Sequence, residues 1–303
     1  MKRNAMKGSV IPVYSGLPTV LQENGYCNLF FMTHESQYDN MNAFLRTNGF
    51  DEIYAQENYP SEKVVNSFGV QDDFMYQYAL PILNERAGTG NPFFSVLLSI
   101  SNHPPYVIPP YFHPHSDVLE EQIVEYADWS IRQFMQAAEK QPWFDNTIFV
   151  FLGDHGKMVG TPECEMPQSY NHIPLMIYGK DIKPGVYDGF GGQVDVSPTL
   201  LGLLNISYLQ NNFGVNLLEE ERPCMFFTAD NLIGARDSVN MFIYSPDSQQ
   251  EFKYKLEEGK LRAATGTDEE AFRNLKDYCF SMLQSTESLV KEHKTLDKVS
   301  VKK

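Results

Sequence analysis

The segment TIFVFLGDHGK, from Thr147 to Lys157, decides the expected fold. Its first six residues are β-branched, aromatic or aliphatic, which predicts a strand buried on both faces. The strand is expected to end at Gly153, and a carboxylate, an imidazole, a second glycine and a lysine follow at once. Open α/β sheets place their chemistry at the carboxyl ends of the strands, so we expect Asp154 and His155 to lie in a site.

The adjacent Asp154 and His155 suit a divalent cation, since a carboxylate oxygen and a neutral imidazole nitrogen can point at the same ion. Gly153 and Gly156 lack side chains that would obstruct a metal or a bulky anion. The alternative is a solvated turn after a strand, because Gly-Asp and His-Gly are ordinary loop dipeptides. From this segment alone, both interpretations stay open.

Composition limits the kinds of partner. With 303 residues, 42% of them hydrophobic and 21% charged, the chain is long enough for one sizeable core or a large domain with an appendage. A net charge of -15 argues against nucleic acid or an anionic membrane surface as the main partner. The chain has no run of about 18 apolar residues, which is what a membrane span would need. Its basic N-terminus lacks the apolar region of a signal peptide. The four scattered cysteines have neither zinc-finger nor disulfide-framework spacing.

Strand and helix patterns alternate through the first two thirds of the chain. Strands are expected at 26–32, 51–55, 92–100, 147–152 and 173–178, and helices at 16–25, 41–47, 72–84, 118–139 and 195–204. The pattern then changes to strands at 225–228, 241–244 and 252–256, a further strand after 260, and a helix at 268–291. This order predicts an α/β fold with a mostly parallel sheet flanked by helices over 1–205. A small α+β subdomain, an antiparallel sheet with a C-terminal helix, is expected over 206–303.

Three expected strand ends carry histidine: His34, near Asp39; His103; and His155 beside Asp154. The carboxyl ends of parallel strands lie along one edge of a sheet, so these clusters are expected to converge. A single histidine is more often a packing residue than a ligand, but three at matching strand ends favour a metal or anion site.

Two further residues are candidate contacts for an anionic substrate. Lys157 follows the Asp-His pair, and a solvated lysine is the alternative interpretation. His172 precedes the strand expected at 173–178, where a packing residue is the alternative. The chain has no G-x-S-x-G nucleophile elbow and no P-loop.

Four segments occur in an order known from one protein family: GFDEIY at 49–54, SNHP at 101–104, GDHG at 153–156 and QVDVSPTLL at 193–201. This order resembles the sulfatase-like branch of the alkaline phosphatase superfamily, and within it the lipoteichoic acid synthase and phosphoglycerol transferase group. The resemblance covers residues 1 to about 205, and the C-terminal sheet and helix also fit it.

The resemblance implies one divalent cation, held by Asp154 and His155. The cation is usually manganese in lipoteichoic acid synthases, with zinc, calcium and magnesium left open. It also implies a threonine nucleophile that attacks a phosphodiester, chemistry that a metal serves by neutralising charge on the phosphoryl oxygens. His103 matches a histidine that contacts the substrate head group. His34 and Asp39 lie in a segment that resembles a substrate-contacting turn.

That turn departs from the family pattern at three positions. Ser36 stands where relatives carry an aspartate, and Met41 and Ala43 stand where they carry a tryptophan and an arginine. Glycerophosphate specificity therefore does not carry over from the resemblance. The chain has no C/S-x-P-x-R motif of formylglycine sulfatases, which favours threonine-based phosphoryl chemistry.

In the family, the nucleophile and an acidic metal ligand precede the helix expected at 16–25. Thr19 and Thr33 do not match the nucleophile's motif. We therefore expect this chain to be the C-terminal part of a larger enzyme or the product of a misplaced start, inactive alone and partnered by a missing N-terminal segment.

Two functions are expected from the sequence. The first is a metal-dependent phosphoryl or sulfuryl transferase or hydrolase, acting on a phosphodiester of the phosphoglycerol type or on a sulfate ester. Its substrate would be an anionic small molecule or a lipid- or glycan-linked ester, and the resemblance implies an extracytoplasmic domain of a membrane-anchored protein. The alternative is a non-catalytic remnant that binds a ligand or partner through the retained pocket.

Overall fold

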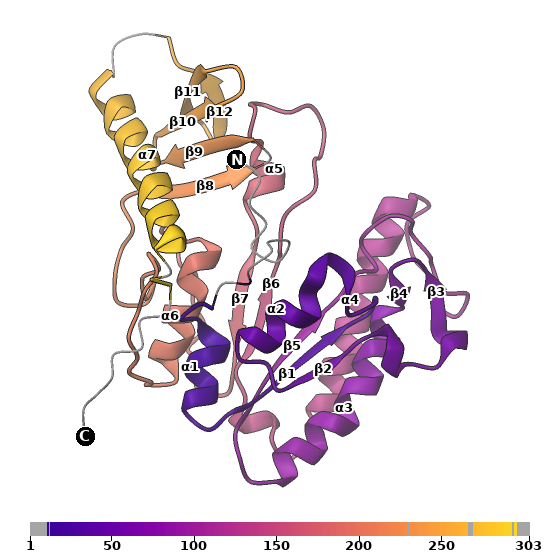
Figure 1. Cartoon of the computed structure of the whole chain (residues 1–303). Helices are drawn as coiled ribbons and strands as arrows, with labels where there is room; N and C mark the ends of the chain where they lie inside the picture. Colours follow the sequence, from indigo (N-terminus) through magenta and orange to yellow (C-terminus); the bar gives the residue numbers. More distant parts are fainter. Residues whose placement is uncertain (1–10, 12, 230, 266–268, 293, 296–303) are drawn as a thin grey trace, which may run out of the picture. The chain divides into compact units, whose positions relative to one another are not determined.

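The computed structural model describes residues 11, 13–229, 231–265, 269–292 and 294–295 (Figure 1). The described residues up to Thr147 form one compact unit, and those from Ile148 onward form a second. No helix among the described residues is long and apolar enough to cross a membrane. The boundary expected near residue 205, between the α/β domain and the C-terminal subdomain, stays a prediction.

The first unit is built on a three-stranded parallel sheet in the order β2-β1-β5. The strands are β1 (Cys27–Met32), β2 (Glu52–Tyr54) and β5 (Phe93–Leu98), and Phe30 of β1 lies opposite Ile53 and Val96. Four α-helices flank them: α1 (Leu17–Glu23), α2 (Met41–Thr47), α3 (Asp72–Gly88) and α4 (Leu119–Ala138). The remaining elements are a hairpin, β3 (Val64–Asn66) with β4 (Gly69–Val70), and the 3₁₀ turns η2 (Tyr38–Asn40), η3 (Gln56–Asn58), η4 (Ser61–Lys63) and η5 (Phe144–Asn146).

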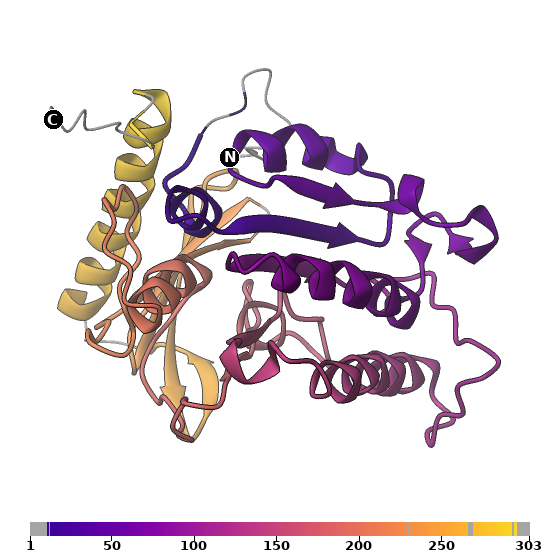
Figure 2. The same cartoon turned by 90° about the horizontal axis from the view of Figure 1, so that it is seen from below.

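Alternation along β1 sends successive side chains to opposite faces of the sheet, and both faces are covered. Leu29 and Phe31 pack in one apolar cluster with Met75 and Ala79 of α3. Phe30 and Met32 pack on the other face, in a cluster that includes Leu45 of α2. Figure 2 shows α2 and α3 on opposite sides of these strands. The strand expected at 26–32 is present as β1, and it is buried within a parallel sheet.

The second unit begins with a two-stranded antiparallel pair, β6 (Phe149–Leu152) and β7 (Leu175–Tyr178). A strand buried on both faces was expected at 147–152, and this detail is wrong. Residues of β6 are half-buried, and Leu152 is 42% exposed. A run of apolar residues predicts an extended segment, but it does not specify which strands will flank it.

The rest of the second unit is helix and antiparallel sheet. The helices are α5 (Gln168–Asn171), α6 (Gln193–Leu203) and α7 (Glu269–Lys291). The sheet has the order β12-β11-β10-β9-β8, with β8 (Met225–Ala229), β9 (Leu232–Arg236), β10 (Asn240–Ser245), β11 (Gln250–Glu257) and β12 (Lys260–Ala263). Helix α7 packs on one face of this sheet through Phe272, Leu275 and Cys279 (Figure 1). The expected antiparallel sheet and C-terminal helix are therefore present.

Candidate functional site

The Asp154–His155 turn follows β6 directly, as expected, and three hydrogen bonds from two side chains fix its backbone. The side-chain amide of Gln193, the first residue of α6, donates to the carbonyl oxygens of Gly153 at 3.1 Å and of Asp154 at 2.8 Å. Oδ1 of Asp154 accepts the backbone N–H of His155 at 2.8 Å. One carboxylate oxygen therefore orders the turn, while Oδ2 faces the imidazole.

The imidazole of His155 is oriented by its own loop. Its Nδ1 lies 2.7 Å from the carbonyl oxygen of Gly156, and a carbonyl can only accept, so we assign the ring proton to Nδ1. The other ring nitrogen, Nε2, lies 3.7 Å from Oδ2 of Asp154. The ring also stacks on Tyr170, with centroids 5.2 Å apart and planes inclined by 28°.

Gly156 allows the loop to fold back against α5. A Cβ at this position would lie 2.1 Å from the carbonyl oxygen of Ser169, which no side chain tolerates. The N–H of Gly156 donates to the carbonyl oxygen of Tyr170 at 2.8 Å. The second glycine of the GDHG segment, Gly156, is therefore required because the backbone at Ser169 lies so close. Space for an ion is not the only reason for a glycine there.

The pair fits one side of a cation site. Oxygen and nitrogen ligands at about 2.0–2.4 Å from a metal lie roughly 3–4 Å from each other, which the 3.7 Å separation satisfies. A metal-bound histidine commonly donates its other N–H to a carbonyl, as His155 does. Within the described parts of the chain, no group of three or more His, Cys, Asp or Glu side chains assembles into a metal site. The metal-binding role of Asp154 and His155 therefore stays a prediction.

Lys157 and His172 both lie in the chain that follows this pair. Lys157 is exposed, two residues after His155. His172 is exposed just after α5, and its backbone N–H donates to the carbonyl oxygen of Gln168 at 2.8 Å. Their roles as substrate contacts stay predictions.

His34 and His103 lie in the first unit, at the carboxyl edge of the parallel sheet. His34 follows β1 and is 3% exposed, and His103 follows β5 and is exposed. Because β1 and β5 are parallel neighbours, the two histidines lie at the same edge of the sheet. Strand β6, which precedes His155, pairs with β7 and not with this sheet, so the expected convergence of all three histidines stays a prediction. Asp39 lies in η2 after His34, where it and Asn40 have left-handed φ values of 50° and 63°.

Both histidines repeat the arrangement of His155. Nδ1 of His34 lies 3.0 Å from the carbonyl oxygen of Glu35, and Nδ1 of His103 lies 2.8 Å from that of Pro104. In each case the carbonyl belongs to the next residue, so the same short loop bond selects the Nδ1–H tautomer. Nε2 is in each case the ring nitrogen that does not make this bond.

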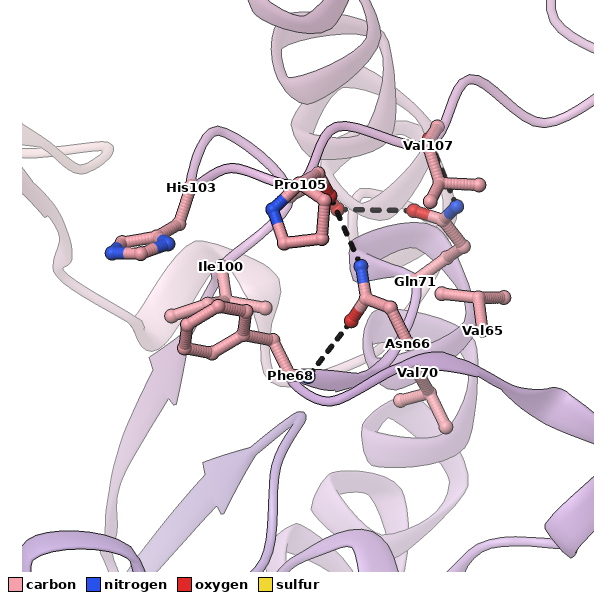
Figure 3. A pocket seen from close by; sticks show the side chains of 10 residues that line it. Val65, Asn66, Phe68, Val70, Gln71, Ile100, His103, Pro105 and Val107 are labelled. Carbon is pink, nitrogen blue, oxygen red and sulfur yellow. Dashed lines mark hydrogen bonds between the residues drawn. The ribbon is translucent and has the colours of Figure 1, made fainter.

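Sequence analysis did not identify the residues that hold the His103 loop. Oδ1 of Asp72, which is 1% exposed, accepts the N–H groups of Ile100 at 2.9 Å and Ser101 at 3.1 Å. Burial raises the pKa of the Asp72 carboxyl, against the lowering effect of these two bonds. Gln71 accepts from Oγ of Ser101 at 3.2 Å and donates to the carbonyl oxygen of Val107 at 3.0 Å (Figure 3). The loop bearing His103 is therefore fixed from the start of α3.

The Sulfatase family model matches residues 4–206. This chain belongs to the Sulfatase family. Lipoteichoic acid synthase 1 of Bacillus subtilis is 24% identical over 283 residues, which cover 82% of this chain and 42% of that protein. Phosphoglycerol transferase I of Xanthomonas campestris pv. campestris is 25% identical over 251 residues, covering 78% and 36%. The chain thus spans less than half the length of these curated relatives.

Solved structures agree with the family and the fold. A protein in the alkaline phosphatase superfamily from Vibrio parahaemolyticus has a TM-score of 0.84 and 25% identity, covering 96% of this chain and 72% of that one. The lipoteichoic acid synthase LtaP of Listeria monocytogenes has a TM-score of 0.75 and 24% identity, covering 93% and 73%. The expected family and α/β fold are confirmed. Members of this family generally use divalent metals, which agrees with the donor atoms of Asp154 and His155.

Proposed function

We propose that this chain takes part in metal-dependent phosphoryl or sulfuryl transfer or hydrolysis, on a phosphodiester of the phosphoglycerol type or on a sulfate ester. The observation that carries the proposal is the Asp154–His155 pair, with Oδ2 and the assigned Nε2 lone pair 3.7 Å apart in a Sulfatase-family chain. A divalent cation bound by these two atoms supplies positive charge that stabilises the oxygens of an anionic ester. Manganese is the cation we would test first, followed by zinc, calcium and magnesium.

The chain's own residues have defined parts in this proposal. Asp154 and His155 hold the cation, and Gln193 keeps their turn in place. The exposed Nε2 of His103 accepts a hydrogen bond from a substrate hydroxyl or, when protonated, donates one to an ester oxygen. His34, Asp39, Lys157 and His172 are further proposed substrate contacts. We assign no nucleophile among the described residues, and the extracytoplasmic placement stays a prediction.

A second candidate is a chain that binds a ligand through the same residues without catalysis. This candidate is favoured because Asp154 and His155 are only two possible ligands. Within the described segments, no third His, Cys, Asp or Glu side chain joins them. Both candidates require the pair to bind a cation. Cation affinity is therefore the first quantity to measure.

Isothermal calorimetry of Mn²⁺ with the full chain and with Asp154→Ala tests the proposal. We expect the variant to bind Mn²⁺ at least about tenfold more weakly. Loss of a residue that only orients a metal ligand already weakens binding by about that factor, and Asp154→Ala removes a proposed ligand itself. Asp188→Ala, which removes an exposed carboxylate elsewhere in the second unit, is the matched control and should bind like the wild type. Equal affinity in Asp154→Ala, or no binding by the wild type, would refute the proposed cation site.

A further inference from the structure

The second unit contains a buried ion pair that the proposed function does not use. Asp195, in the first turn of α6, is fully buried, and the side chain of Arg222 is 9% exposed. Nε of Arg222 donates to Oδ1 and Oδ2 of Asp195 at 2.9 and 2.8 Å, and Nη2 donates to Oδ1 at 2.5 Å and to the carbonyl oxygen of Phe213. Such a pair fixes the two segments that carry it, because removing either partner leaves an uncompensated buried charge.

The ion pair joins the first turn of α6 to the segment 213–222. Oδ1 of Asp195 also accepts the backbone N–H of Val215 at 2.8 Å. A Cβ at Gly214 would lie 2.2 Å from the carbonyl oxygen of Val194, so the segment rests directly on the backbone of the helix. The position of the first turn of α6 is therefore set by this segment.

The same helical turn carries Gln193, whose side-chain amide holds the turn after β6 by two hydrogen bonds. Gln193 lies between Asp195 and Gly192, and the N–H of Gly192 donates to Oδ2 of Asp195 at 2.8 Å. The carboxylate therefore holds the backbone on both sides of Gln193. A connected path runs from Arg222 through Asp195 and the backbone at Gln193 to the carbonyl oxygen of Asp154.

A second anchor of the segment 213–222 provides a comparison within the same helix. The backbone N–H of Leu217 donates to Oγ1 of Thr199, which is buried, at 3.1 Å. Thr199 lies more than one helical turn after Gln193, whereas Asp195 lies in the same turn as Gln193. A purely structural role would make the two anchors equivalent, and a positioning role would not.

We propose that Arg222 is a positioning residue for the two proposed cation ligands, Asp154 and His155. It acts through Asp195 and Gln193, so a residue beyond the 4–206 match to the Sulfatase family model influences how tightly a divalent cation is bound. The proposal rests on the proposed function for the cation. The position of the turn does not depend on that function, because hydrogen bonds define it without a metal.

The first test is Arg222→Lys, with Mn²⁺ affinity measured by calorimetry on the full chain. Lysine keeps a positive charge beside Asp195 but lacks the planar group that bonds both carboxylate oxygens. We expect Mn²⁺ affinity to fall about two- to tenfold. The fall should not exceed that in Gln193→Ala, about tenfold, because Arg222 acts through Gln193. Arg262→Lys, the same replacement at an exposed arginine of β12, should bind like the wild type.

A double-mutant cycle separates positioning from a general loss of stability. In the Gln193→Ala background, Arg222→Lys should change Mn²⁺ affinity less than about twofold, because the group through which it acts is gone. Thr199→Val removes the acceptor of the second anchor, and it should lower the melting temperature without changing Mn²⁺ affinity. Gly214→Ala pushes the same segment away from α6, so it should act like Arg222→Lys and replaces that variant if thermal melting shows it to be unfolded. Wild-type affinity in Arg222→Lys, additive losses in the double mutant, or an equal loss in Thr199→Val would each overturn the proposal.

A second readout needs no metal. The side-chain NH₂ signals of Gln193, assigned by their absence in Gln193→Ala, are followed by NMR of the metal-free full chain. They should shift in Arg222→Lys and stay in place in Arg262→Lys and Thr199→Val. Unchanged signals in Arg222→Lys would overturn the positioning role. Failure of the wild type to bind Mn²⁺, with the Gln193 signals still shifting in Arg222→Lys, would overturn the cation site and leave the role of Arg222 in holding the turn standing.

Discussion

At the residue scale, the amide of Gln193 supports the cation pair without being a ligand. Its two hydrogen bonds, to the carbonyl oxygens of Gly153 and Asp154, fix the backbone that carries the two proposed ligands, Asp154 and His155. We expect Gln193→Ala to weaken Mn²⁺ binding about tenfold, the usual cost of losing a residue that orients a metal ligand. Calorimetry measures it, with Gln133→Ala, an exposed glutamine on α4, as the control. Wild-type affinity in Gln193→Ala would show that the turn holds its shape unaided.

Residue types and spacing were enough to single out Asp154, His155, His34 and His103 as candidates, because each follows an apolar run that forms a strand. They were not enough to find Asp72, whose carboxylate holds the His103 loop through backbone N–H groups 28 and 29 residues further along the chain. Gln193 was within reach of the sequence, since it begins one of the four segments that carry the family resemblance. Its partners, however, are the backbone carbonyls of Gly153 and Asp154, which lie 40 and 39 residues earlier in the sequence.

At the element scale, the loop from Gly153 to α5 is anchored on the C-terminal sheet. Cys164 and Met166 lie in an apolar cluster with Met241, Ile243 and Leu261. Polar contacts reinforce the anchor. Tyr254 donates to Glu165 at 2.6 Å, and Arg236 of β9 donates to Oε1 of Gln168 at 3.1 Å. The sheet therefore supports the same loop that carries the proposed cation ligands.

This anchoring predicts a linked loss of stability and affinity. Met166 is 1% exposed, so Met166→Ala should cost about 2–5 kcal/mol of unfolding free energy through the cavity that it leaves. The loosened loop should also bind Mn²⁺ more weakly. Urea unfolding and calorimetry measure the two effects, with Met158→Ala as the control, because Met158 lies in the same loop and is 49% exposed. A destabilised Met166→Ala variant with unchanged Mn²⁺ affinity would show that the packing of Met166 does not support the cation site.

The elements themselves were predictable where periodicity is strong. The expected helix at 118–139 is α4, Leu119–Ala138, and the expected strand at 92–100 contains β5, Phe93–Leu98. Strand β9 was missed because Gly234 and Ala235 weaken its pattern. These small residues fit a tight position, since a Cβ on Gly234 would lie 3.1 Å from Sδ of Met166. Local sequence does not record such a neighbour, which is why the strand was not expected.

At the scale of the whole molecule, the family and the α/β fold were predictable because several short segments in a fixed order carry them together. Charge is the other property that belongs to the whole chain. A net charge of -15 creates a negative potential that attracts a divalent cation and repels an anionic ester. Local contacts at either candidate site act within this field.

Salt should therefore affect the two kinds of ligand in opposite directions. Raising the ionic strength from about 0.01 M to about 0.1 M shortens the Debye length from about 30 Å to about 10 Å. We expect Mn²⁺ affinity to fall and the affinity for inorganic phosphate to rise over this range, as calorimetry and NMR titration would measure. Replacing Glu219, Glu220 and Glu221, which are exposed in the second unit, with glutamine changes the net charge from -15 to -12 and should flatten both trends. Parallel trends for the two ligands would mean that local contacts outweigh the field of the chain.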